Sequence, residues 1–198
     1  MRNIVLTGVL FFSLILGASA ESINHEPDDL KSNVSLLTNQ CGYVLGKNIL
    51  SEISKSSSKI NDQIISFDFY VSLKPADRPI HGKLSFGCFT VGSAAPKQGV
   101  AQRPTAAEEI AQADSGGRYA RNVVWQRRYE GKGWSGTIAY VNSVFGDQEN
   151  LNIPDYFLIC PDKGGLACFS FEVVKAKLNK KESDRIPELL EGIGVGGF

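Results

Sequence analysis

The chain has 198 residues, with 21 Lys and Arg against 21 Asp and Glu, and 42% of its residues are hydrophobic. This hydrophobic share, with no net charge, excludes an intrinsically disordered chain. The balanced charge also argues against a nucleic-acid binder or a polybasic membrane-surface protein, because both depend on a positive excess. We therefore expect one folded domain.

Residues 1–20 have the pattern of a cleaved signal peptide. Arg2 is followed by an apolar run from Ile4 to Gly17 and by the small-residue sequence Ala18-Ser19-Ala20. The run is shorter than the ~20 apolar residues that a membrane-spanning helix needs, so we expect cleavage after Ala20 and no stable membrane anchor. The mature domain, residues 21–198, is then exported, most simply to a bacterial periplasm, with secretion as the alternative.

Four cysteines are present: Cys41, Cys88, Cys160 and Cys168. In an oxidising compartment an even number of cysteines predicts two disulfides. Cys160 and Cys168 flank turn residues between two strand-like runs, which favours a bridge near the end of a hairpin and leaves Cys41 to pair with Cys88. No short repeated spacing suggests zinc, so we expect neither a metal nor another cofactor.

The mature chain begins with a helical pattern. Apolar residues recur at steps of three and four from Pro27 to about Ile53, which predicts a helix whose inner stripe includes Cys41. Gly42 and Gly46 leave two shorter helices as the alternative. The serine-rich segment 54–58 is interpreted as the end of the helical region.

Beyond residue 61 the period changes to two, as in a half-buried strand. We expect strands at about residues 65–71, 82–91, 122–129, 135–144, 156–159 and 169–174. Their short connections favour antiparallel pairing. The predicted fold is α+β, with the N-terminal helix packed on a mainly antiparallel sheet of about six strands.

We also make predictions for three segments outside these elements. Residues 92–117 lack large apolar side chains apart from Val100 and Ile110, which predicts an exposed loop insertion. Within it, Thr105 and Glu108 fit a capping box and begin a short helix that ends near Ala113. Ser183–Glu191 is expected to form a helical turn or two, and the glycine-rich segment 192–198 a flexible tail.

Few residues suggest catalysis. His25 and His81 lack the sequence framework of a known catalytic motif. Asp147, Glu149 and Asp155 form the best acidic group, which could be solvated, calcium-like or the carboxylate pair of a hydrolase.

A basic and aromatic segment follows the loop. The candidate partner-binding residues are Arg121, Arg127, Arg128, Tyr129, Lys132 and Trp134. On a strand Trp125, Arg127 and Tyr129 share one face, and Arg128 lies on the other. Arginine and aromatic residues are enriched in the energetic centres of protein interfaces, which favours a binding hairpin. An ordinary solvated strand with aromatic residues in the core is the alternative.

The sequence therefore predicts an exported binding or inhibitory protein rather than an enzyme. Its most concrete form is a periplasmic immunity protein or inhibitor that neutralises a toxin or a cell-wall hydrolase by protein–protein contact. A small-ligand, glycan or lipid-binding protein is the alternative, and a hydrolase that uses carboxylates is a weaker one.

Overall fold

The computed structural model describes residues 29–61, 63–74, 78–89, 103–114, 116–146, 149–162 and 166–196. The predicted signal peptide, His25, Asp147 and Val100 lie outside these ranges, as do the last two residues of the predicted tail.

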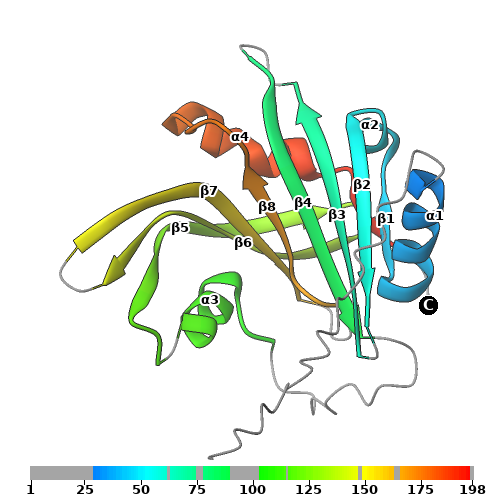
Figure 1. The fold of residues 1–198 in the computed structure, drawn as a ribbon. Coiled ribbons are helices and arrows are strands. Elements are labelled where there is room, and N and C mark those ends of the chain that lie inside the picture. Colours follow the sequence, from blue (N-terminus) through cyan, green and yellow to red (C-terminus); the bar gives the residue numbers. More distant parts are fainter. Residues whose placement is uncertain are drawn as a thin grey trace, which may run out of the picture.

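An antiparallel sheet of seven strands dominates the described residues, in the order β2-β3-β4-β8-β7-β6-β5. The predicted α+β class and mainly antiparallel pairing are confirmed. The strands are β2 (Ile53–Ile60), β3 (Ile64–Leu73), β4 (Ile80–Phe89), β5 (Tyr119–Gly131), β6 (Trp134–Gly146), β7 (Glu149–Pro161) and β8 (Phe169–Val173). Figure 1 shows β2, β3 and β4 crossing the direction of β5, β6 and β7 at a steep angle, so the sheet is strongly twisted.

The prediction of one helix that continues to about Ile53 is wrong, because the structure divides this region into several short elements. The α-helix α1 (Asp29–Leu36) continues into the π-helical turn η1 (Leu37–Cys41), which ends at Gly42 in the left-handed conformation, with φ of 73°. A short strand β1 (Tyr43–Leu45) and a one-turn helix α2 (Lys47–Leu50) follow. Glycine adopts positive φ without a steric penalty, and here it ends the helix.

The serine-rich segment that was expected to end the helical region forms strand β2 instead. It lies at the edge of the sheet, and Ser56 is its buried residue. The only apolar residues of β2 are the isoleucines at its two ends. Alternation of apolar and polar residues therefore could not identify this strand.

The structure also differs from the prediction of a flexible tail at residues 192–198, because part of this segment is a strand. Ile193–Val195 form strand β9, which pairs with β1, and Ile193 is fully buried. Gly46 donates its backbone N–H to Gly192 O at 2.7 Å, and a Cβ at Gly46 would lie 2.5 Å from that oxygen. The glycines thus permit a close approach of two backbones, which a sequence pattern of glycines does not distinguish from flexibility.

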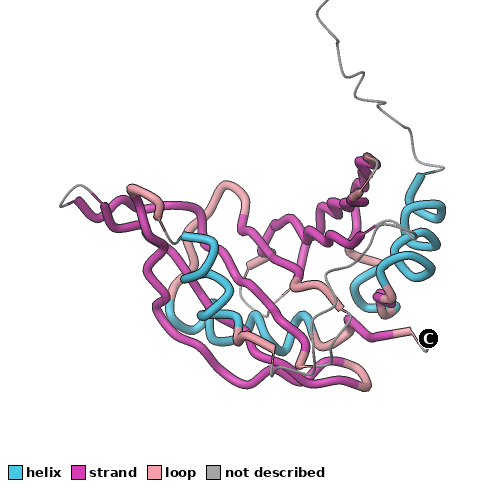
Figure 2. The backbone as a smooth tube through the Cα atoms, turned by 90° about the horizontal axis from the view of Figure 1, so that it is seen from below, coloured by secondary structure: helices cyan, strands magenta, loops and turns pink. Residues whose placement is uncertain are grey.

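The main core lies on one face of the sheet, which we call the inner face and which carries Phe86, Phe157 and Phe169. Helix α4 (Lys180–Leu190) buries Ile186 and Leu190 against it. On the same face η1 is joined to β4 by the Cys41–Cys88 disulfide. Figure 2 shows α1 beside one end of the sheet and α3 toward the other.

Helix α3 (Ala106–Asp114) covers the opposite face, the outer face, where Ala139, Val141 and Leu158 lie. Its capping box is confirmed: Thr105 N–H donates to Glu108 Oε2 at 2.7 Å and Glu108 N–H to Thr105 Oγ1 at 3.4 Å. The helix is not simply exposed, however, because Ala106 and Ile110 are buried against the sheet. One isoleucine and small alanines are sufficient to bury this face, which corrects the expectation of an exposed insertion over residues 103–114.

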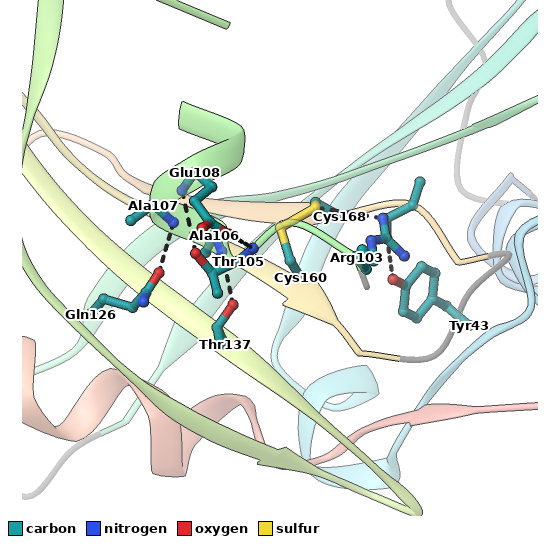
Figure 3. The surroundings of a disulfide bond; sticks show 11 residues. Tyr43, Arg103, Thr105, Ala106, Ala107, Glu108, Gln126, Thr137, Cys160 and Cys168 are labelled. Carbon is teal, nitrogen blue, oxygen red and sulfur yellow. Dashed lines mark hydrogen bonds between the residues drawn. A yellow bond between two sulfur atoms is a disulfide. The ribbon is translucent and has the colours of Figure 1, made fainter. Parts of the chain in front are cut away.

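The second predicted disulfide, Cys160–Cys168, is also present. Figure 3 shows the residues that begin α3, together with Arg103, around this bond. Arg103 Nη2 lies 3.6 Å from Cys168 Sγ, and Ala106 N–H donates to Thr137 Oγ1 at 2.8 Å. The disulfide and the start of α3 therefore form one packed unit on the outer face. Of the helices described, none is long and apolar enough to cross a membrane.

Candidate binding surface

Two of the predicted partner-binding residues lie in the core. Tyr129 is 1% exposed and Trp134 is 8% exposed. The Tyr129 hydroxyl donates to Leu190 O at 2.7 Å, and Trp134 Nε1 donates to Ile193 O at 2.9 Å. These side chains join the hairpin to α4 and β9, so their surfaces are not available to a partner.

The neighbouring basic residues point to different sides of the sheet. The Arg127 guanidinium lies 4.3 Å from the centre of the Trp125 ring, as the shared face predicts, and pairs with Asp184 of α4. Arg128 Nη1 lies 2.6 Å from Asp162 Oδ2, and its Nη2 donates to Ser135 Oγ at 2.7 Å. Lys132 is exposed at the hairpin end, where its N–H donates to Ile193 O. These contacts are within the chain, and they do not gather the basic residues into one surface.

The acidic candidates are also separated. Glu149 is exposed at the start of β7, whereas Asp155 is fully buried and accepts hydrogen bonds from the Tyr140 hydroxyl and from Leu178 N–H. Asp155 thereby anchors the segment that leads to α4. No group of three or more His, Cys, Asp and Glu residues is placed to hold a metal ion within the described ranges. His81 is exposed on β4.

A hollow of about 250 Å³ opens on the outer face beside Arg121. It is lined by Arg121, Ile153, Pro154, Tyr156 and Glu172. Val141 pairs with Tyr156 and Ser143 with Asn152, so residues 153–155 of β7 stand opposite residue 142 alone. Such a bulge bends its strand and redirects side chains. Here Ile153 and Pro154 form one wall of the hollow.

Arg121 is held in place from one side by the end of α3. Its N–H donates to Asp114 Oδ2 at 2.6 Å, and its Nη1 lies 3.5 Å from Asp114 Oδ1. The Asp114 side chain is only 10% exposed, whereas that of Arg121 is 38% exposed. A carboxylate that is mostly buried therefore orients a guanidinium that remains accessible from the hollow.

One of the residues that line the hollow, Tyr156, is aromatic. The Arg121 guanidinium lies 6.0 Å from the centre of the Tyr156 ring. Burial raises the pKa of the Tyr156 phenol, although nearby Arg121 lowers it in part. Glu172 stands directly opposite Tyr156 in the pairing of β7 with β8. The hollow thus combines a neutral phenol, a guanidinium and a carboxylate with apolar walls.

Exposed apolar side chains extend this site along the sheet. Tyr119 is 41% exposed and Leu151 is 43% exposed. Arg121 pairs with Val144, which pairs with Leu151, so these residues share the outer face with Tyr119. We define the Arg121 surface as Tyr119, Arg121, Leu151, Ile153, Pro154, Tyr156 and Glu172.

Sequence reasoning found Arg121 but missed the residues that β7 and β8 contribute to this surface. Leu151, Ile153, Pro154 and Tyr156 lie some distance along the chain from Arg121, and only the register of β5, β6 and β7 brings them to it. Pro154 inside a strand-like run was an available signal, because proline within a sheet is found at edges and bulges. Comparison with known proteins found no family model, curated protein or solved structure that matches the chain.

Proposed function

We propose that this chain is a binding protein that acts by contact with another protein through the Arg121 surface. The observation that carries this proposal is an oriented, accessible arginine surrounded by exposed tyrosine and leucine side chains beside a hollow. Tyrosine and arginine dominate the residues on which interface affinity depends. A preformed hollow offers a place for one anchoring side chain of the partner.

The composition of the surface favours a protein partner over an isolated ion. The Arg121 charge is partly balanced by Asp114, and the Glu172 carboxylate also lines the hollow. The hollow therefore presents a donor group and an acceptor group together with the apolar side chains of Ile153 and Pro154. Interfaces between proteins commonly have an apolar centre and a polar rim.

The proposed setting is an exported, oxidising compartment, with the periplasm preferred and secretion as the alternative. Two disulfides and no free cysteine in the described chain support this setting, because such bonds persist in oxidising compartments. Within it, the most concrete role is inhibition of a toxin or a cell-wall hydrolase, as an immunity protein does.

The test begins with the mature chain as bait for envelope and secreted fractions of the producing organism. The captured protein is identified, purified and titrated against the bait and its variants. Arg121→Ala and Tyr119→Ala are each expected to weaken binding by ~2 kcal/mol, because both remove accessible side chains from the centre of the contact. An inhibitory role further requires that a stoichiometric amount of the chain lowers the activity of the partner.

Arg128→Ala is the matched control. Arg128 is also an exposed strand arginine held by an aspartate, but it lies at the hairpin end, outside the Arg121 surface. Its variant should bind with unchanged affinity. A purified partner that binds the folded Arg121→Ala and Tyr119→Ala variants as tightly as the unaltered chain would contradict the proposal.

A further inference from the structure

The hollow beside Arg121 is lined by two opposite charges that the described part of the chain leaves incompletely paired. Arg121 uses its backbone N–H and its Nη1 for Asp114, and its Nε and Nη2 have no acceptor among the described residues. Glu172 is half-buried, and it forms no hydrogen bond or ion pair with another described residue, although Lys83 stands opposite it in register. A charge that is partly buried without a partner costs free energy, which a ligand of complementary charge would recover.

The two charges lie on either side of Tyr156. The Arg121 guanidinium lies 6.0 Å from the centre of the Tyr156 ring, and Glu172 is the direct neighbour of Tyr156 on β8. Because neighbouring strands are ~4.8 Å apart, the guanidinium and the Glu172 carboxylate are separated by roughly 10 Å. This separation is too wide for an ion pair between them, and it leaves room for a small ligand that contacts both.

The apolar wall of the hollow is fixed by contacts within the chain. Lys177 Nζ donates to Asn142 O at 3.0 Å and to Ile153 O, so it ties β6 and β7 together at the bulge that carries Ile153 and Pro154. A wall that is already ordered lowers the entropy cost of binding. The volume of about 250 Å³ is below the ~300–1,000 Å³ of pockets that hold drug-sized molecules, which indicates a smaller ligand.

We propose that this hollow binds a free α-amino acid with an apolar side chain. Its carboxylate would accept hydrogen bonds from Arg121 Nε and Nη2, and its ammonium group would donate to Glu172. The two charged groups of an α-amino acid are separated by one carbon, which places nitrogen and oxygen about 3 Å apart. With a hydrogen bond of about 2.9 Å at each end, the ligand spans about 9 Å, in agreement with the separation of Arg121 and Glu172. Its side chain would pack against Ile153 and Pro154.

The two charges also exclude simpler ligands. An anion alone would pair with Arg121 but leave Glu172 without a partner, and a cation alone would do the reverse. A dipeptide carries its terminal charges ~3.5 Å further apart than an amino acid does, which exceeds the available separation. The amino acid site shares Arg121 with the proposed protein interface, but neither proposal requires the other, because Tyr119 and Leu151 of that interface do not line the hollow.

The test is calorimetric titration of the mature chain with L-leucine and with L-phenylalanine, which offer apolar side chains of two shapes. At least one is expected to bind with micromolar to millimolar affinity. The N-acetyl derivative of that amino acid lacks the ammonium charge, and its amide lacks the carboxylate. Each should bind at least about tenfold more weakly, as expected for loss of a charged hydrogen-bond partner. The corresponding dipeptide should also bind at least about tenfold more weakly.

Variants of the chain test the two contacts separately. Glu172→Gln and Arg121→Gln should each weaken amino acid binding at least about tenfold. Glu130→Gln is the matched control, because Glu130 is also a strand glutamate but pairs with Arg128 and lies outside the hollow. It should leave the affinity unchanged. Tyr119→Ala should likewise leave amino acid affinity unchanged, although it weakens the protein partner.

Three results would overturn the amino acid site. The first is that neither amino acid binds the folded chain at millimolar concentration. The second is that the N-acetyl derivative, the amide or the dipeptide binds as tightly as the amino acid itself. The third is that folded Glu172→Gln binds the amino acid as tightly as the unaltered chain. None of these results bears on the proposed protein interface, which is tested by the effect of Tyr119→Ala and Arg121→Ala on the protein partner.

Discussion

Glu182 combines a helix cap with an ion pair at the start of α4. Its carboxylate accepts the Asn179 N–H at 2.8 Å, and Asn179 Oδ1 accepts the Glu182 N–H at 2.9 Å. Arg78 Nε donates to Glu182 Oε1 at 2.5 Å, and Arg78 Nη2 donates to Glu182 Oε2 at 2.8 Å. The hydrogen bond from Arg78 is the main reason that the pKa of Glu182 falls from 4.5 to about 2.

This lowered pKa predicts a specific pH dependence. The carboxylate stabilises the fold above its unfolded pKa, and the contribution is lost as pH falls from about 5 toward 2. Glu182→Gln keeps a side chain able to cap the helix but removes the charge, so we expect a loss of ~1 kcal/mol at pH 7, because Arg78 is partly exposed and the pair is screened by solvent. Urea unfolding at several pH values should show this difference shrinking in acid.

The control for this prediction is Glu188→Gln on the same helix. The Glu188 side chain is 68% exposed, and its ion pair with Arg185 is long, with 4.0 Å between Glu188 Oε2 and Arg185 Nε. It should change stability by a few tenths of a kcal/mol at most. A Glu182→Gln loss that stays constant from pH 7 to pH 2.5 would show that the charge does not contribute.

Residue-level prediction succeeded where one strand contained the information. The alternation along β5 correctly placed Arg127 beside Trp125. It could not show that Tyr129 and Trp134 are buried, because the atoms that accept their hydrogen bonds belong to Leu190 and Ile193, at the far end of the chain. Burial of a strand face depends on which distant element covers it, and a local pattern does not identify that element.

At the scale of elements, helix α3 is held on the sheet by a small buried apolar area. Ile110 is its large buried side chain, packed in the cluster with Ala106, Ala139, Val141 and Cys160. Ile110→Ala is expected to destabilise the protein by ~2–4 kcal/mol, since it removes buried methyl groups and leaves a cavity. Thermal or urea unfolding measures this loss.

Gln112→Ala is the comparison on the same helix, because residue 112 is exposed. It should change stability by less than ~0.5 kcal/mol. Helix α3 also provides Asp114, which orients Arg121. Ile110→Ala should therefore also lower the affinity of the Arg121 surface for its protein partner. If Ile110→Ala is as stable as Gln112→Ala, α3 is not anchored by this side chain.

Element prediction followed the strength of the periodic signal. The alternating strands β3 and β4 and the capping box of α3 were foreseen correctly. Strands β2 and β9 were missed because one is rich in serine and lysine and the other is three residues long between glycines. Both are stabilised by pairing with a neighbouring strand, which is a tertiary effect.

For the whole molecule, the two disulfides constrain very different lengths of chain. Cys41 and Cys88 are 47 residues apart in sequence and connect η1 to β4, whereas Cys160 and Cys168 are 8 residues apart. All four lie in or against the two hydrophobic clusters, so removal of either pair costs some packing. The difference between the pairs should therefore reflect mainly the loops that they close in the unfolded chain.

The closure entropy of a loop increases with the logarithm of its length, which gives ~4 kcal/mol for the longer loop and ~2.5 kcal/mol for the shorter one. We expect the double variant Cys41→Ser, Cys88→Ser to be less stable than Cys160→Ser, Cys168→Ser by ~1.5 kcal/mol. Urea unfolding of both variants under the same conditions measures this difference. An equal or larger loss for the short-loop variant would mean that the contacts of Cys160 and Cys168 with the start of α3, rather than chain entropy, dominate the stabilisation by that bond.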